Sequence, residues 1–104
     1  MITFDDFKKL DLRVGEIKSV EDLEGADSLY RVVVDLGEEE RQVLAGLKDY
    51  YEKEEMEGKK VIIVANLEPK SMFGEESQGM ILAAGEEAKL LTTDGEVENG
   101  SKVS

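Results

Sequence analysis

Two short and strongly apolar runs, VIIVA at residues 61–65 and MILAA at residues 80–84, limit the choice of fold for this chain. Turn-forming residues bound both runs, which suits strands whose two faces are covered. A helix is the weaker alternative for residues 61–65, because the run is short and β-branched and Pro69 follows it. We therefore predict two buried strands.

The segment between these runs, residues 66–79, is polar. It holds the only proline of the chain, two glycines and several side chains that can form hydrogen bonds. Strands at both of its ends would hold it in place, and loops anchored in this way often carry binding residues. We therefore predict a binding loop here.

Three further strands are predicted before residue 61. Residues 11–20 form a strand in which the apolar positions change phase across Gly15, which predicts a bulge or sharp bend at that glycine. Residues 29–36 alternate apolar and polar side chains, and residues 40–45 form the next strand after a turn. The last two segments should therefore pair as a hairpin.

A helical turn and a helix are predicted as well. Residues 3–10 begin with Thr3 as a cap and Asp6 in the capping-box position. Residues 47–56 carry apolar side chains at helical spacing, and Gly58 ends the segment.

The order of these elements predicts the fold class. Three strands, the helix and two more strands follow one another, with a short extra segment at residues 89–93. A single helix between the third and fourth of five strands is typical of the OB-fold, a small Greek-key barrel that binds oligonucleotides on one face. We therefore predict an all-β OB-fold, a five-stranded Greek-key barrel with one helix, and a single domain over residues 1–104.

The residue types that are missing exclude several kinds of function. Cysteine and histidine are absent, which removes disulfides, thiol nucleophiles and the usual zinc sites. Because a nucleophile motif and a phosphate-binding glycine loop are also absent, we expect no enzyme activity, no cofactor and no metal. The N-terminus carries acids where a signal peptide carries bases, and no apolar run reaches membrane-spanning length. We expect a soluble, cytoplasmic protein with no membrane partner.

The charge of the chain argues against a nucleic-acid partner. The chain has 13 Lys and Arg residues and 25 Asp and Glu residues, which gives a formal net charge of −12. Proteins that bind nucleic acids usually have a basic excess, because phosphate contacts supply much of their affinity. High salt would weaken this objection, since the screening length falls to roughly 3 Å at about 1 M.

Several stretches read together nevertheless resemble one family. They are FKKLDLRVG at residues 7–15, VDLGEEERQV at 34–43, ANL at 65–67, ESQGMILAA at 76–84 and GSKVS at 100–104. They resemble the tRNA-binding domain found at the C-terminus of methionyl-tRNA synthetases, in free-standing tRNA-binding proteins and in endothelial monocyte-activating polypeptide. The resemblance covers nearly the whole chain.

The resemblance implies a function and partners. It implies an OB-fold that binds tRNA by shape, at the outer corner of the L and largely independently of sequence. It also implies a homodimer held by segments near the chain ends. The dimer would act as a cofactor or appended domain of methionyl-tRNA synthetase, with the catalytic domain of that synthetase as a further partner.

The resemblance also indicates which residues would contact tRNA. Those carried over from the family are Asn66, Lys70, Ser77, Gly79 and Met80. From their chemistry we add Phe73, Gln78, Arg41 and Lys60. Phe73 could stack on an unpaired base, worth roughly 1–3 kcal/mol, and Gln78 could donate to phosphate or a 2′-hydroxyl.

Each of these candidates has a structural alternative. Asn66 could bond its own backbone as a turn former, Met80 could pack in the core, and Phe73 could anchor the loop on the barrel. Ser77 and Gln78 could fix the loop, and the cations could simply be solvated.

The chain departs from the family pattern in its binding loop. Glu68 and Ser71 stand where the family commonly has basic residues, and Glu75 stands where an apolar residue is usual. These departures raise the alternative that RNA binding has been lost and that the domain serves dimerisation or docking to a synthetase. The related secretion-chaperone branch, which binds unfolded polypeptide, is a third hypothesis, and the retained SQGM segment at residues 77–80 argues against it.

Overall fold

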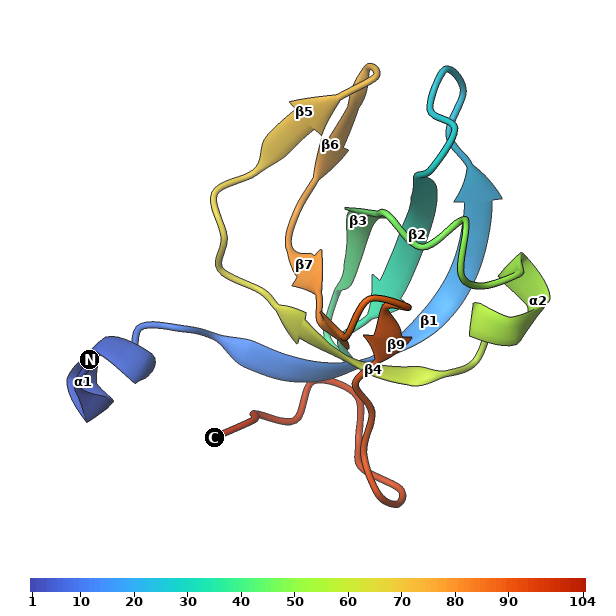
Figure 1. Cartoon of the computed structure of the whole chain (residues 1–104). Helices are drawn as coiled ribbons and strands as arrows, with labels where there is room; N and C mark the ends of the chain where they lie inside the picture. Colours follow the sequence, from blue (N-terminus) through green and yellow to red (C-terminus); the bar gives the residue numbers. More distant parts are fainter.

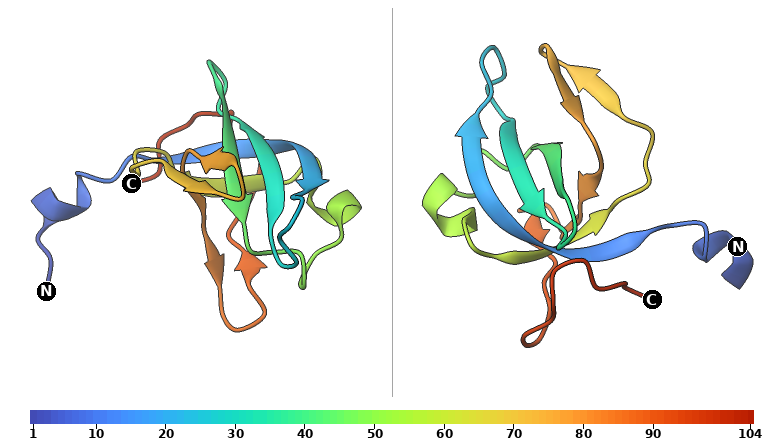
Figure 2. Two further views of the ribbon diagram at one scale, coloured as in Figure 1. Left: turned by 90° about the horizontal axis from the view of Figure 1, so that it is seen from above. Right: turned by 180° about the vertical axis from the view of Figure 1, so that it is seen from behind.

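The computed structural model describes residues 1–104, and its strands curve into a nearly closed barrel (Figure 1 and Figure 2). Five antiparallel strands form the main sheet in the spatial order β3-β2-β1-β4-β7, and two small hairpins, β5–β6 and β8–β9, extend from it. The predicted OB-like barrel is therefore confirmed. The elements are α1 (Phe4–Phe7), β1 (Leu12–Asp22), β2 (Tyr30–Asp35), β3 (Glu40–Ala45), α2 (Lys53–Met56), β4 (Lys60–Val64), β5 (Lys70–Met72), β6 (Glu75–Ser77), β7 (Met80–Ile81), β8 (Ala83–Ala84) and β9 (Lys89–Leu90).

Strand β1 is long and curved, and it changes partner along its length. Its first half pairs with β4 and its second half with β2. The predicted irregularity is present, but the register shift lies between Ile17 and Ser19 rather than at Gly15. Gly15 has a different role, because a Cβ atom there would overlap Cγ1 of Val34 on the neighbouring strand.

The hairpin of β2 and β3 agrees with the prediction. Side chains of β2 alternate between buried and half-buried positions, as the period-2 pattern requires. Val32, Val34 and Val43 are fully buried and join an aliphatic core with β1, β4 and α2. This core supports the strands that carry the candidate residues.

The predicted helix over residues 47–56 is wrong in extent, because only Lys53–Met56 is α-helical. Leu47 and Met56 are both buried, so the apolar spacing reflects two side chains that pack in the core and not one continuous helix. Between them the Tyr51 carbonyl accepts a hydrogen bond from the Tyr30 hydroxyl at 2.8 Å, and the Tyr51 hydroxyl accepts one from the Leu90 amide. These contacts with distant strands hold Tyr51 outside the helix.

The prediction of one strand over residues 80–84 is also wrong. The strand is interrupted at Leu82, so that β7 pairs with β4 while β8 pairs with β9. The predicted loop at residues 66–79 contains a hairpin, β5–β6, whose two-residue turn is formed by Phe73 and Gly74.

The N-terminal arm, residues 1–10, projects from the barrel (Figure 1). It contains the predicted helical turn α1, and the capping box between Thr3 and Asp6 is present. None of the α1 residues is buried. No helix in the protein has the length and apolar character needed to cross a membrane.

Candidate nucleic-acid interface

Hairpin β5–β6 stands beside the loop that joins β1 to β2, over one end of the barrel (Figure 1). We call residues 66–80, which comprise this hairpin and its two stems, the rim. Met72 packs against a small apolar cluster made by Leu23, Ala26 and Leu44. The Arg31 guanidinium forms ion pairs with Glu75 on the hairpin and with Glu21 on β1. These contacts hold the rim against β1, β2 and β3.

A hollow of about 320 Å³ opens between the hairpin and the end of the barrel. Its walls include Leu67, which is 42% exposed, and Met80, which is 48% exposed. The complete lining is Leu44, Leu67, Glu68, Lys70, Met72, Ser77, Gly79 and Met80. Four of the nine predicted tRNA-binding residues therefore meet at this hollow.

Ser77 and Gly79 shape the hollow through their own internal contacts. The buried Ser77 hydroxyl accepts a hydrogen bond from the Leu44 amide at 3.0 Å and donates to the Gly79 carbonyl at 3.2 Å. Gly79 has φ +144°, and a Cβ atom there would lie 2.8 Å from the Val64 carbonyl oxygen. Only glycine fits this position.

Phe73 and Met80 are exposed, contrary to their structural alternatives. Phe73 lies at the hairpin turn and leaves 57% of its surface exposed. Core packing, the structural alternative for Met80, is wrong, because in β7 the buried position belongs to its neighbour Ile81. Successive side chains of a strand point to opposite faces, so burial of Ile81 turns Met80 outward.

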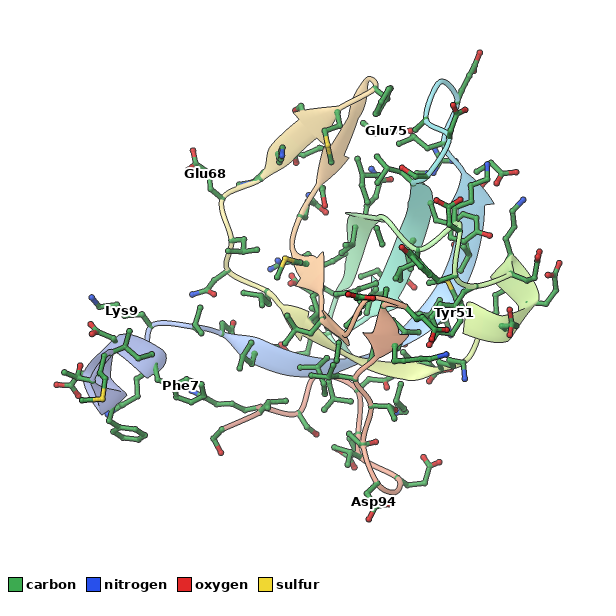
Figure 3. All side chains as sticks on the ribbon, viewed as in Figure 1. Phe7, Lys9, Tyr51, Glu68, Glu75 and Asp94 are labelled. Carbon is green, nitrogen blue, oxygen red and sulfur yellow. The ribbon has the colours of Figure 1, made fainter.

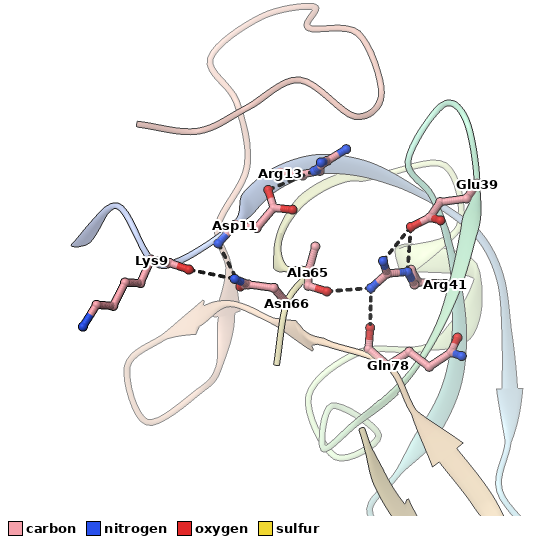
Figure 4. A network of polar contacts seen from close by, with 8 residues as sticks. All are labelled: Lys9, Asp11, Arg13, Glu39, Arg41, Ala65, Asn66 and Gln78. Carbon is pink, nitrogen blue, oxygen red and sulfur yellow. Dashed lines mark hydrogen bonds and ion pairs between the residues drawn. The ribbon is translucent and has the colours of Figure 1, made fainter. Parts of the chain in front are cut away.

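Gln78 and Arg41 close the barrel between β3 and the rim. The Gln78 amide donates to the Gln42 carbonyl at 2.8 Å. Arg41 Nη1 donates to the Ala65 carbonyl at 2.6 Å and to the Gln78 carbonyl at 3.3 Å, and its Nε donates to Glu39 at 2.7 Å (Figure 4). The donors of Arg41 are therefore largely used within the protein.

The Asn66 side chain bonds the backbone of Lys9 and Asp11 rather than its own backbone. Its Oδ1 accepts from the Asp11 amide at 2.8 Å and its Nδ2 donates to the Lys9 carbonyl at 2.7 Å (Figure 4). Lys60 lies apart from the rim residues, because its Nζ donates to the Val97 carbonyl and to Asn99 in the C-terminal segment.

The electrostatics of the rim differ from those of a basic RNA-binding surface. Hydrogen bonding to Glu75, and then to Glu21, raises the pKa of Arg31, and Arg41 is paired with Glu39. Glu75 lies near the hairpin tip, whereas the Glu68 side chain projects away from the barrel (Figure 3). Lys70 is exposed and has no carboxylate partner, so it is the free cation of the rim.

The prediction missed the apolar wall and the ion pair that positions the hairpin. Leu67 and Met72 line the hollow, and Arg31 holds Glu75. Little in the sequence signalled the hairpin, because KSM at residues 70–72 and EES at residues 75–77 do not alternate and Phe-Gly is not a preferred turn pair. No local signal marked Arg31, because its partner lies 44 residues away.

Comparisons with known proteins agree with the resemblance noted above. The sequence profile of the family described as "Putative tRNA binding domain" matches residues 12–102. Methionine–tRNA ligase of Pyrococcus horikoshii is 60% identical over 98% of this chain, but the match covers only 14% of that ligase. The chain thus spans about one seventh of the length of this relative.

Two solved structures are close to the whole chain. A methionyl-tRNA synthetase related protein from P. horikoshii has a TM-score of 0.90 and 38% identity, with 100% of this chain and 98% of that chain covered. The chaperone CsaA from Picrophilus torridus has a TM-score of 0.92 and 37% identity, with both chains fully covered.

Proposed function

This chain belongs to the tRNA-binding domain family, and from that premise we propose that it binds folded tRNA on the rim. In the proposal the chain recognises tRNA by shape, largely independently of sequence, and acts in the cytoplasm as a non-catalytic cofactor or appended domain of methionyl-tRNA synthetase. One observation carries the proposal: four of the predicted residues, Lys70, Ser77, Gly79 and Met80, line one hollow, and Phe73 is exposed at the turn of the hairpin beside it.

The exposed apolar side chains would contact bases. Phe73 offers an aromatic face at the hairpin tip, and Leu67 and Met80 offer aliphatic walls in the hollow. Unpaired bases stack on such side chains with little sequence preference, because every base has an apolar face. Lys70 would contact a phosphate, which positions the RNA without reading its sequence.

The acidic surface requires that shape and apolar contact dominate this binding. The formal net charge is −12, and both arginines next to the rim already have carboxylate partners. A small number of phosphate contacts gives a shallow dependence of affinity on salt. We therefore expect weaker salt dependence than the family resemblance alone suggests.

We propose further that the protein forms a homodimer through the N-terminal arm. Ile2 and Phe4 are each 72% exposed, and Met1 and Leu10 are exposed as well. These apolar side chains project on an arm that makes few contacts with its own barrel, so a second copy would cover them. Each protomer of such a dimer would present its own rim to tRNA.

Titration of labelled tRNA tests the proposal, with Lys70→Glu as the variant and Lys18→Glu as the matched control. Lys18 is an exposed lysine of β1 without a carboxylate partner and lies outside the rim. We expect Lys70→Glu to weaken binding more than the control does, because a carboxylate would replace the cation that contacts phosphate. A stable dimer that binds no tRNA at micromolar concentration would instead support a dimerisation or docking module.

A second candidate function is binding of unfolded polypeptide, which one feature of the rim favours. Strand β5 pairs only with β6, so its other edge offers free backbone groups beside the apolar hollow. Extended peptides add to such edges and place side chains in adjacent pockets. Protection of an aggregating client by the wild type, lost when Met80 is replaced by Glu, would support this function.

A further inference from the structure

Three parts of the chain meet at the end of β4, on Ala65 and Asn66. The Ala65 amide donates to the Asp11 carbonyl at 2.7 Å, which joins the end of β4 to the base of the N-terminal arm. The Ala65 carbonyl accepts from Arg41 of β3 at 2.6 Å. Asn66 is the first residue of the rim. The arm, the barrel and the rim are thus joined within two residues (Figure 4).

The Asn66 amide holds the arm as a paired strand would. Its oxygen accepts from the Asp11 amide and its nitrogen donates to the Lys9 carbonyl, at 2.8 and 2.7 Å. One side chain therefore binds the backbone on both sides of Leu10. Any movement of the arm at this point changes two hydrogen bonds of the rim's first residue.

Arg41 transfers this constraint to the other stem of the rim. Its guanidinium binds the carbonyls of Ala65 and Gln78, which precede and follow the hairpin. Both stems are thus fixed relative to each other, and one of them is fixed to the arm. A rim held at both stems is preorganised, which lowers the entropy cost of binding.

We propose that Asn66 couples the N-terminal arm to the rim, so that assembly through the arm and tRNA binding on the rim strengthen each other. This inference rests on the proposed function. A second copy that covers the arm would fix Lys9 and Asp11, and those groups would fix Asn66. Asn66 is thus a positioning residue, and both the oxygen and the nitrogen of its side-chain amide bond the arm and its base within the protein.

Reciprocal coupling makes the proposal measurable. If assembly raises the tRNA affinity of each rim by a given factor, saturating tRNA must raise the dimer association constant by the product of the factors of the two rims. We expect this product to be about five to ten, within the usual range for coupled sites. Loss of both Asn66 hydrogen bonds should make the two events independent.

The test is sedimentation of the full chain over a range of protein concentrations, with and without saturating tRNA. In the wild type, tRNA should lower the dimer dissociation constant about five- to tenfold. In Asn66→Ala the change should fall below about twofold. Asn66→Asp keeps the acceptor for the Asp11 amide but loses the donor to Lys9, so it should give an intermediate factor.

Lys70→Ala is the matched control, because Lys70 lines the hollow of the rim and forms no hydrogen bond or ion pair with residues 1–10. It should weaken tRNA binding and leave the coupling factor unchanged once tRNA is saturating. Thermal unfolding confirms that each variant is folded. A wild-type coupling factor in Asn66→Ala would overturn the inference, even if tRNA affinity fell. Absence of tRNA binding by the wild type would overturn the proposed function and the coupling together.

Discussion

The turn of hairpin β5–β6 allows a substitution that separates the stability of the hairpin from its contact with RNA. Phe73 has φ +52° and Gly74 has φ +79°, which is the pattern of a type I′ turn. A bulky residue with positive φ is strained, whereas Asn tolerates this region and Asn-Gly is the preferred type I′ pair. Phe73→Asn therefore keeps the turn and removes the aromatic ring.

The two expected effects of Phe73→Asn have opposite signs. Relief of the backbone strain should raise the free energy of unfolding by about 1 kcal/mol. The ring is 57% exposed, so its removal should cost little packing. Loss of one stacked base should weaken tRNA binding by about 1–3 kcal/mol, which is about 5- to 150-fold in the dissociation constant.

Urea unfolding measures the first effect and titration of labelled tRNA measures the second. Phe73→Tyr is the control, because it keeps an aromatic ring and should retain wild-type affinity within about twofold. Wild-type tRNA affinity in Phe73→Asn would refute the stacking role. A lower free energy of unfolding would refute the assignment of turn strain.

Three further predictions follow from contacts around the rim and the arm. Glu75→Gln leaves Glu21 as the only carboxylate partner of Arg31 and frees part of its charge for phosphate, so the loss of tRNA affinity between 50 and 200 mM salt should rise from about 3.5-fold toward about 12-fold per rim, as the logarithmic slope moves from about −0.9 toward about −1.8. Ser77→Ala should lower the free energy of unfolding in urea by about 1–3 kcal/mol, because the Leu44 amide loses its acceptor. The hydrogen bond from the Thr3 amide lowers the pKa of Asp6. The α1 cap should therefore be fully formed above the ordinary pKa range of a carboxylate and be lost as the pH falls through the lowered pKa. Amide hydrogen exchange at Thr3 measures this loss.

Each of these predictions has a control or a contrary result. Glu76→Gln removes the same charge from a residue that forms no ion pair, and it should leave the salt dependence near that of the wild type. Ser71→Ala changes an exposed serine and should be nearly neutral. Protection of the Thr3 amide that does not change down to strongly acidic pH would contradict the role of Asp6 in the cap.

The sequence predicts the elements that local patterning determines. The β2–β3 hairpin follows from alternation alone, because Tyr30, Val32 and Val34 all face the core. The capping box of Thr3 and Asp6 is likewise a local signal. The extent of the second helix could not be predicted, because the hydroxyl of Tyr30 reaches the Tyr51 carbonyl from another strand.

Long-range contacts also limit what the sequence predicts about the candidate site. Lys70, Ser77, Gly79 and Met80 lie close together in sequence, and the structure brings them to one hollow. The RNA contact predicted for Asn66 stays a prediction, and the structure adds that its side chain bonds backbone groups up to 57 residues away. A polar side chain in a loop shows its chemistry in the sequence, whereas the partner that uses this chemistry depends on the tertiary fold.

The conflict between an acidic chain and an RNA partner is resolved when the pairing of charges is considered. Composition counts every carboxylate as repulsive, but Glu75 and Glu39 hold the two arginines that fix the hairpin and its stems. These carboxylates lower the electrostatic attraction to phosphate and at the same time fix the geometry of the rim. What remains exposed there is a set of apolar side chains, Leu67, Phe73 and Met80, with Lys70 as the free cation and Glu68 and Glu76 as carboxylates without an ion pair. Because stacking and shape are insensitive to salt while repulsion is screened by it, the proposed tRNA binding by such a surface should persist at salt concentrations that weaken a basic binder.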